Sequence, residues 1–148
     1  ILLFVCASLI AAFIIQYSLG HKPCKLCIYE RIPYIVSIFL LFEIIFFKKK
    51  IKITLLFLSL IFIFSTILAF YHVGIEQGFF SESLVCENKN FSENLSKDQL
   101  LEQLKNNTIS CKDVSFKFLG LSLASINGIF SLVLSAIFLR LFKNYGKN

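Results

Sequence analysis

The sequence contains few charged residues, no Trp and no Met, and each shortage narrows what the chain can be. Only 16% of its 148 residues are charged, whereas 57% are hydrophobic. An average soluble domain is about 25% charged and about 45–50% apolar, so the composition indicates a membrane protein. Because the chain starts at Ile1 and lacks Met, we expect the natural N-terminus to lie further upstream.

The chain is basic, with a net charge of +6, but its charges are not arranged as in nucleic-acid-binding proteins. Those proteins concentrate Lys and Arg on one soluble face or along one helix. Here many lysines border apolar runs, as the four between positions 48 and 52 do, which is typical of membrane topology. We therefore expect contact with membrane lipid and no nucleic-acid partner. The length fits one domain over residues 1–148.

Four apolar runs predict four membrane spans, at about 1–19, 30–47, 53–71 and 119–142. About 20 apolar residues cross the hydrocarbon core, and backbone groups in lipid must be hydrogen-bonded within the spanning structure. Since the runs do not alternate in polarity, they predict an all-α membrane protein, a bundle of four transmembrane helices. A signal peptide explains the first run poorly, because that run is long, lacks a small-x-small cleavage site and precedes three others.

Basic residues near the span ends predict the orientation, since they gather on the cytoplasmic side. The basic turn at 48–52 and the basic C-terminus are expected there, which places the loops 20–29 and 72–118 outside. Two spans separate these loops, so they share one side in either orientation. In the longer loop, Ser96-Lys97-Asp98-Gln99 fits a capping box and predicts a short amphipathic helix from residue 97 to about 105.

The five cysteines are unevenly distributed along the predicted topology. Cys24 and Cys27 lie in the first outer loop, Cys86 and Cys111 in the second, and Cys6 inside the first span. On an oxidising face such thiols form disulfides. A bridge that closes a loop of about 25 residues adds roughly 3 kcal/mol of stability, so the second pair could be structural. A Cys-x-x-Cys ring closes almost no loop and opens easily, which favours a redox role for the first pair.

Metal and haem sites explain the cysteines less well. A structural zinc site requires four ligands, often from two Cys-x-x-Cys pairs, and the second pair of cysteines is spaced far apart, so we expect no metal. Haem attachment requires Cys-x-x-Cys-His, but Ile28 follows Cys27. Cys6, alone in an apolar helix, is expected to act as a small hydrophobic residue.

Arg31 and His72 are the candidate residues for binding a cofactor. Arg31 follows Cys27 by four residues, so a helix would place both on one face. Arg31 and the N-terminus of the second span would then lower the pKa of Cys27, and Arg31 could hold a quinone on which negative charge develops. Snorkelling to the interface is the alternative for Arg31. His72 could donate a hydrogen bond or titrate, or serve as an interfacial anchor. Pro33 leaves open whether Cys27 and Arg31 precede the helix.

Together these residues resemble the DsbB family, the disulfide bond formation protein B of bacterial inner membranes. The resemblance covers essentially the whole chain in order. It is carried by Pro23-Cys24-Lys25-Leu26-Cys27-Ile28-Tyr29-Glu30-Arg31, His72-Val73-Gly74-Ile75-Glu76-Gln77, the Cys86/Cys111 pair and Phe118-Leu119-Gly120-Leu121-Ser122.

The resemblance implies a quinone-linked thiol oxidase, a multi-pass inner-membrane protein with its redox cysteines on the periplasmic side. It implies that Cys86 and Cys111 form the disulfide that oxidises a soluble periplasmic dithiol protein of the DsbA type. Cys86 would form the mixed disulfide with that partner. The Cys24–Cys27 disulfide would then reoxidise the second pair.

By the same resemblance, Cys27 beside Arg31 passes the electrons to a bound ubiquinone or menaquinone, and His72 lies near the quinone ring. Two alternatives belong to other classes. One is a thiol oxidoreductase of the vitamin K epoxide reductase type, in which the Cys-x-x-Cys next to the quinone comes late in the chain. The other is a non-enzymatic membrane protein with two structural disulfides.

Overall fold

The computed structural model describes residues 1–21, 23–48, 50–81, 111, 117–118 and 120–145. This part of the chain is mostly helical, as the apolar runs predict. Its elements are α1 (Leu2–Tyr17), α2 (Lys25–Tyr29), α3 (Ile32–Phe47), α4 (Ile51–Glu76), β1 (Lys117–Phe118), β2 (Leu121–Ser122) and α6 (Leu123–Tyr145).

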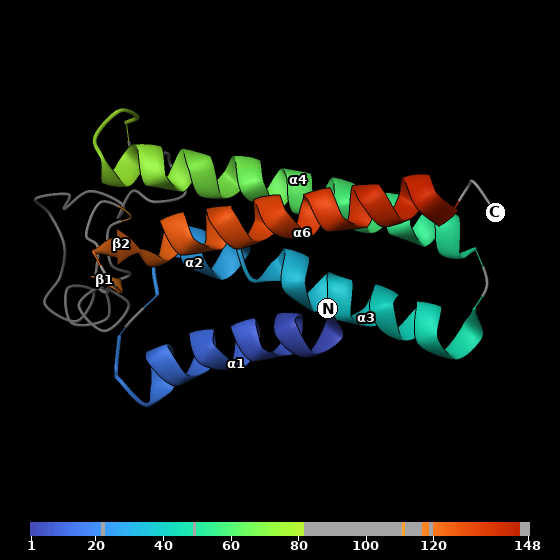
Figure 1. Cartoon of the computed structure of the whole chain (residues 1–148). Coiled ribbons are helices and arrows are strands. Elements are labelled where there is room, and N and C mark those ends of the chain that lie inside the picture. Colours follow the sequence, from blue (N-terminus) through green and yellow to red (C-terminus); the bar gives the residue numbers. More distant parts are fainter. Residues whose placement is uncertain (22, 49, 82–110, 112–116, 119, 146–148) are drawn as a thin grey trace, which may run out of the picture.

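The helices α1, α3, α4 and α6 run lengthwise through the molecule, and α2 lies at one end (Figure 1). By length and composition, α4 and α6 are able to cross a membrane. The apolar helix α1 and the helix α3 each contain 16 residues, which corresponds to about 24 Å of helix. The structure therefore confirms two long apolar helices, and the crossing by four spans stays a prediction.

The outer and inner surfaces of these helices are those of a membrane protein. Five phenylalanines of α3 and α4 are between 62% and 72% exposed: Phe39, Phe46, Phe47, Phe64 and Phe70. Four serines are almost completely buried: Ser37, Ser59, Ser65 and Ser131. Apolar side chains outside and small polar residues at helix contacts are typical of helices that pack against one another in lipid.

Aromatic rings form the centre of the core between the long helices. Phe62 of α4 stacks on Phe138 of α6 with 5.7 Å between ring centroids. Tyr34 of α3 meets the Phe62 ring edge to face at 5.5 Å. Val5 of α1 and Leu58 of α4 belong to the same cluster. This core holds the long helices together, and so positions the end of the bundle where α2 and the first cysteine pair lie.

The helix ends differ from the predicted boundaries. Pro33 is the second residue of α3, in the first turn, where proline does not kink the helix. The helix α4 continues to Glu76, and α6 begins at Leu123, after two antiparallel two-residue strands that the all-α prediction did not include. Gly120, with φ +82°, supplies the left-handed backbone of the turn between them. The amphipathic helix predicted over 97–105 lies outside the described residues.

Candidate functional site

The first cysteine pair forms a disulfide at the start of α2. Cys24 is bonded to Cys27, with 5.2 Å between the Cα atoms. Cys24 caps the N-terminus of α2, and its Sγ accepts a hydrogen bond from the backbone N–H of Cys27 at 3.1 Å. Cys24 is only 5% exposed, whereas Cys27 is partly exposed. The predicted disulfide is thus confirmed, and its two sulfurs have different surroundings.

A cavity of about 210 Å³ opens beside Cys27. Its walls come from α1, from the segment around α2, and from the N-terminal parts of α3 and α6, and they are mostly apolar. Its polar lining includes Gln16, Glu30, Arg31, Tyr34 and Asn127. An apolar cavity of roughly 150 Å³ accepts a benzene ring, so this cavity has room for one aromatic or quinonoid ring.

Arg31 is held at the cavity by α1. Its Nη1 donates a hydrogen bond to Oε1 of Gln16, and its guanidinium carbon lies 5.1 Å from the centroid of the Phe13 ring, a cation–π contact. Arg31 and Cys27 line the same cavity. Cys27 lies inside α2, and α3 begins only at Ile32, so the N-terminus of the second long helix does not adjoin Cys27 as the sequence suggested.

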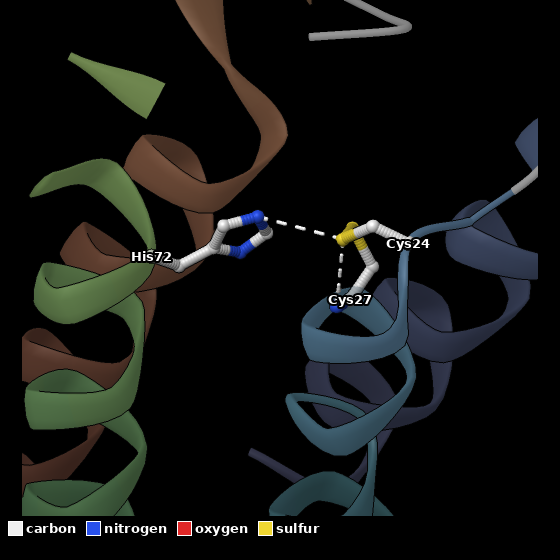
Figure 2. Close-up of side chains that lie close together, drawn as sticks. All are labelled: Cys24, Cys27 and His72. Carbon is white, nitrogen blue, oxygen red and sulfur yellow. Dashed lines mark hydrogen bonds between the residues drawn. A yellow bond between two sulfur atoms is a disulfide. The ribbon is translucent and has the colours of Figure 1, made fainter. Parts of the chain in front are cut away.

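His72 reaches the disulfide from α4 on the Cys24 side, as Figure 2 shows. Its Nε2 lies 3.5 Å from Sγ of Cys24, and its Nδ1 hydrogen-bonds Oε1 of Glu30 at 2.8 Å. The imidazole is only 2% exposed. Among the described residues, the cavity lining includes His21 but not His72. His72 therefore lies outside the cavity, next to the enclosed sulfur of Cys24.

Glu30 connects His72 to a chain of buried hydrogen bonds. Its Oε2 accepts from Nδ2 of Asn127 at 2.9 Å, and Oδ1 of Asn127 accepts from the Tyr34 hydroxyl at 2.6 Å. The chain continues through Ser131 to Ser65. Glu30 is only 7% exposed. The turn between α2 and α3 brings it inside, where donors from α4 and α6 satisfy the carboxylate.

The sequence contained a signal for some of these unpredicted residues. Gln16 and Asn127 are polar amides inside predicted apolar spans, and polar residues at such positions are typically functional. No pattern in the sequence pointed to Tyr34, since tyrosine is common near span ends. Glu30 follows the Cys-x-x-Cys pair closely, but its burial depends on helices that come much later in the chain.

The second cysteine pair is described only in part. Cys111 is a disulfide cysteine, is 2% exposed, and belongs to one buried cluster with Cys24, Leu26 and Ile75. Cys86 lies outside the described residues. Cys6, on α1, carries a free thiol. Two disulfide cysteines that are distant in the sequence therefore gather at one end of the long helices.

The site offers one place for a ring-shaped cofactor and one for a metal ion. The cavity beside Cys27 and Arg31 suits a cofactor. The Sγ atoms of Cys24 and Cys27 and a ring nitrogen of His72 lie within 4.8 Å of one another, a spacing that metal coordination allows. In the disulfide form the two sulfurs are bonded to each other, so metal coordination would require their reduction.

Long apolar helices, a disulfide at their end and an apolar cavity beside one sulfur define a membrane protein built for thiol–disulfide chemistry. The chain belongs to the DsbB family: residues 1–141 match the family described as Disulfide bond formation protein DsbB. It is also similar to the Uncharacterized protein RP370 of Rickettsia prowazekii (strain Madrid E), with 30% identity over 143 residues, 95% of this chain and 83% of that protein. No solved structure matches the chain. Membership confirms the resemblance and makes the protein a disulfide-forming membrane oxidoreductase.

Proposed function

We propose that this protein is a thiol:quinone oxidoreductase that reoxidises a periplasmic dithiol protein of the DsbA type and passes the electrons to ubiquinone or menaquinone. The observation that carries the proposal is the cavity beside the disulfide, which Cys27 and Arg31 both line. A thiol pair next to a ring-sized apolar cavity is the arrangement that electron transfer to a lipid-soluble ring requires.

The residues at the cavity fit a quinone. When bound, a quinone supplies a two-electron acceptor. The apolar walls would enclose its ring, and the Arg31 guanidinium is a fixed positive donor for an oxygen on which negative charge develops. The contacts of Arg31 with Gln16 and Phe13 hold that donor in place before any ligand arrives.

The two sulfurs of the disulfide take different roles in this proposal. Cys27 lines the cavity and is the sulfur that would meet the quinone. Cys24 is enclosed and lies next to Nε2 of His72, which is placed to exchange a proton with its thiol. Glu30 bonds the other ring nitrogen and so orients the imidazole. His72, which the resemblance associates with the quinone ring, is here assigned to Cys24.

The donor side of the reaction depends on the second cysteine pair. Proteins of the DsbA type have reduction potentials of about −120 mV, whereas structural disulfides have potentials below about −300 mV. Only a labile cysteine pair linked to an electron acceptor can therefore oxidise a DsbA-type protein. We assign Cys86 and Cys111 to that pair, with Cys86 forming the mixed disulfide. The shared buried cluster of Cys111 and Cys24 supports exchange between the two pairs.

The orientation in the bacterial inner membrane follows from the two ends of the molecule. The turn between α3 and α4 and the last residues of α6 lie at one end, and α2 lies towards the other (Figure 1). That turn carries Lys48 and Lys50, and basic residues favour the cytoplasmic side. We therefore propose a multi-pass protein with its redox cysteines on the periplasmic side.

The test is reconstitution of the full chain in lipid nanodiscs with a reduced DsbA-type protein and ubiquinone. We expect loss of partner thiols to match loss of quinone absorbance, and Cys27→Ser to abolish both. Arg31→Ala should raise the apparent KM for quinone by at least about tenfold, since it removes a charged donor worth about 1.5–3 kcal/mol. Arg140→Ala, at an exposed position of α6, is the matched control.

Two outcomes would refute the proposal. One is partner oxidation at the wild-type rate by Cys27→Ser. The other is resistance of both disulfides to a mild reductant in the wild-type protein, since structural bridges resist reduction whereas catalytic bridges exchange. An unchanged KM for Arg31→Ala would remove Arg31 from the quinone site.

A further inference from the structure

We propose that the reduced Cys24–Cys27 pair, with His72 and Glu76, forms a binding site for a zinc-class divalent cation. The two thiolates, the imidazole and the carboxylate make up a four-ligand set of the kind that zinc prefers. The proposal requires only that the disulfide can be reduced. It is independent of the quinone reaction.

Cys24, Cys27 and His72 bring their ligand atoms within 4.8 Å of one another, and two distances to Nε2 of His72 are close to those of a tetrahedral site. With zinc bonds of about 2.3 Å to sulfur and about 2.0–2.1 Å to nitrogen, tetrahedral angles place the sulfur and nitrogen about 3.6 Å apart. Sγ of Cys24 and Nε2 of His72 lie 3.5 Å apart. Oε1 of Glu76 lies 3.7 Å from the same nitrogen. Reduction would free Cys27 to supply the second sulfur from the same short helix.

The imidazole is oriented as in known zinc sites. A ligating histidine usually donates its other ring N–H to a carboxylate, which fixes the tautomer and the direction of the ring. Nδ1 of His72 bonds Oε1 of Glu30, which leaves Nε2 directed at Cys24. Asn127 in turn holds the second oxygen of Glu30. The outer shell of the proposed site is therefore already assembled.

Glu76 supplies an independent indication that a cation belongs here. Its side chain is 7% exposed, and its Oε2 is buried without a hydrogen-bond partner among the described residues. A buried, unpaired carboxylate oxygen is costly, typically by more than about 1–3 kcal/mol. A divalent cation bound by this carboxylate, the imidazole and the two thiolates would compensate for that cost.

The structure also removes the reason why the sequence argued against zinc. The sequence showed one Cys-x-x-Cys pair and no second pair at a suitable spacing. The fold adds ligands from α4: His72 lies next to Sγ of Cys24, and Glu76, one helical turn further along, lies 3.7 Å from the His72 imidazole. The ion would approach from the side of Cys27, which is partly exposed.

Zinc binding by the reduced cysteine pair involves no electron transfer. Two thiols and one zinc ion give a zinc dithiolate and two protons, and no group is oxidised or reduced. Because the same two sulfurs form either the disulfide or the metal site, the two states exclude each other. Zinc should therefore hold the pair reduced and protect both thiols from alkylation.

The experiment uses the full chain with Cys86→Ser and Cys111→Ser, so that only the first pair can bind, reduced without oxygen in detergent micelles. Cobalt is the probe, because four-coordinate cobalt thiolates have strong visible and charge-transfer absorption. We expect one cobalt per chain, displaced by zinc, and none on the disulfide form. His72→Ala and the isosteric Glu76→Gln should each weaken binding by at least about tenfold, whereas Glu43→Gln, at an exposed position of α3, should not.

Cobalt binding by the disulfide form, or equal binding by the parent chain, His72→Ala and Glu76→Gln, would overturn the proposal. Reoxidation of each variant to the Cys24–Cys27 disulfide, measured by mass spectrometry, verifies that the site is still folded. Since the readout involves neither quinone nor partner, failure of the reduced parent chain to bind cobalt, with intact quinone reduction by the wild-type protein, would reject this site alone.

Discussion

Replacing Glu30 with glutamine tests whether the buried carboxylate organises the site. Glu30→Gln keeps the shape of the side chain and opens no cavity. The carboxylate accepts hydrogen bonds from two sides, from His72 at 2.8 Å and from Asn127 at 2.9 Å. A glutamine has one oxygen and one NH₂ group, so it can accept only one of these two hydrogen bonds.

The size of the effect follows from these two contacts. A hydrogen bond to a charged group contributes about 1.5–3 kcal/mol, and a neutral one about 0.5–1.5 kcal/mol. The variant loses one charged bond and weakens the other, which sums to roughly 2–4 kcal/mol. A neutral amide is cheaper to bury than a carboxylate, so we expect the free energy of unfolding to fall by about 2 kcal/mol, or roughly thirtyfold in the folding equilibrium.

The assay is unfolding by sodium dodecyl sulfate in mixed micelles, followed by circular dichroism. Glu43→Gln makes the same chemical change at an exposed position of α3, where the stability should stay within about 0.5 kcal/mol of wild type. Unfolding of Glu30→Gln at the same detergent fraction as Glu43→Gln would show that the carboxylate does not hold the site together.

Two further predictions concern the cavity and the hydrogen-bond chain. Ala12→Phe places a ring into the cavity and should raise the apparent KM for quinone at least about tenfold, whereas Ala7→Phe, at an exposed position of the same helix, should not; equal kinetics for both variants would move the quinone elsewhere. In a double-mutant cycle of unfolding free energies, Tyr34→Phe and Asn127→Ala should couple by about 0.5–1.5 kcal/mol, and strict additivity would contradict the hydrogen bond between them.

The sequence predicted the helices and the first disulfide because both depend on local patterns. Apolar runs require helices in lipid, and the two cysteines of a Cys-x-x-Cys motif are close enough to form a disulfide with each other. The exact ends were harder, since α4 continues past Tyr71 and two short strands precede α6. Those ends depend on turn geometry at Gly120 and on packing, which hydropathy does not describe.

The buried polar contacts could not be predicted, because their partners come from distant helices. Asn127 lies 97 positions after Glu30 in the chain, and His72 lies 48 after Cys24. A helical period shows which residues share a face, but not which helix that face meets. The sequence therefore suggested Arg31 and His72 as cofactor residues. It could not show that Arg31 lies on the Cys27 side of the disulfide and His72 on the Cys24 side.

The unequal surroundings of Cys24 and Cys27 give the disulfide two unlike ends. A bulky reagent can approach from the Cys27 end, while the other end is closed by protein. Mixed disulfides, alkylation and oxidative damage from that direction should thus begin at a single atom. Attack on the bond is therefore expected at Sγ of Cys27, because the helices leave that sulfur the more accessible of the two.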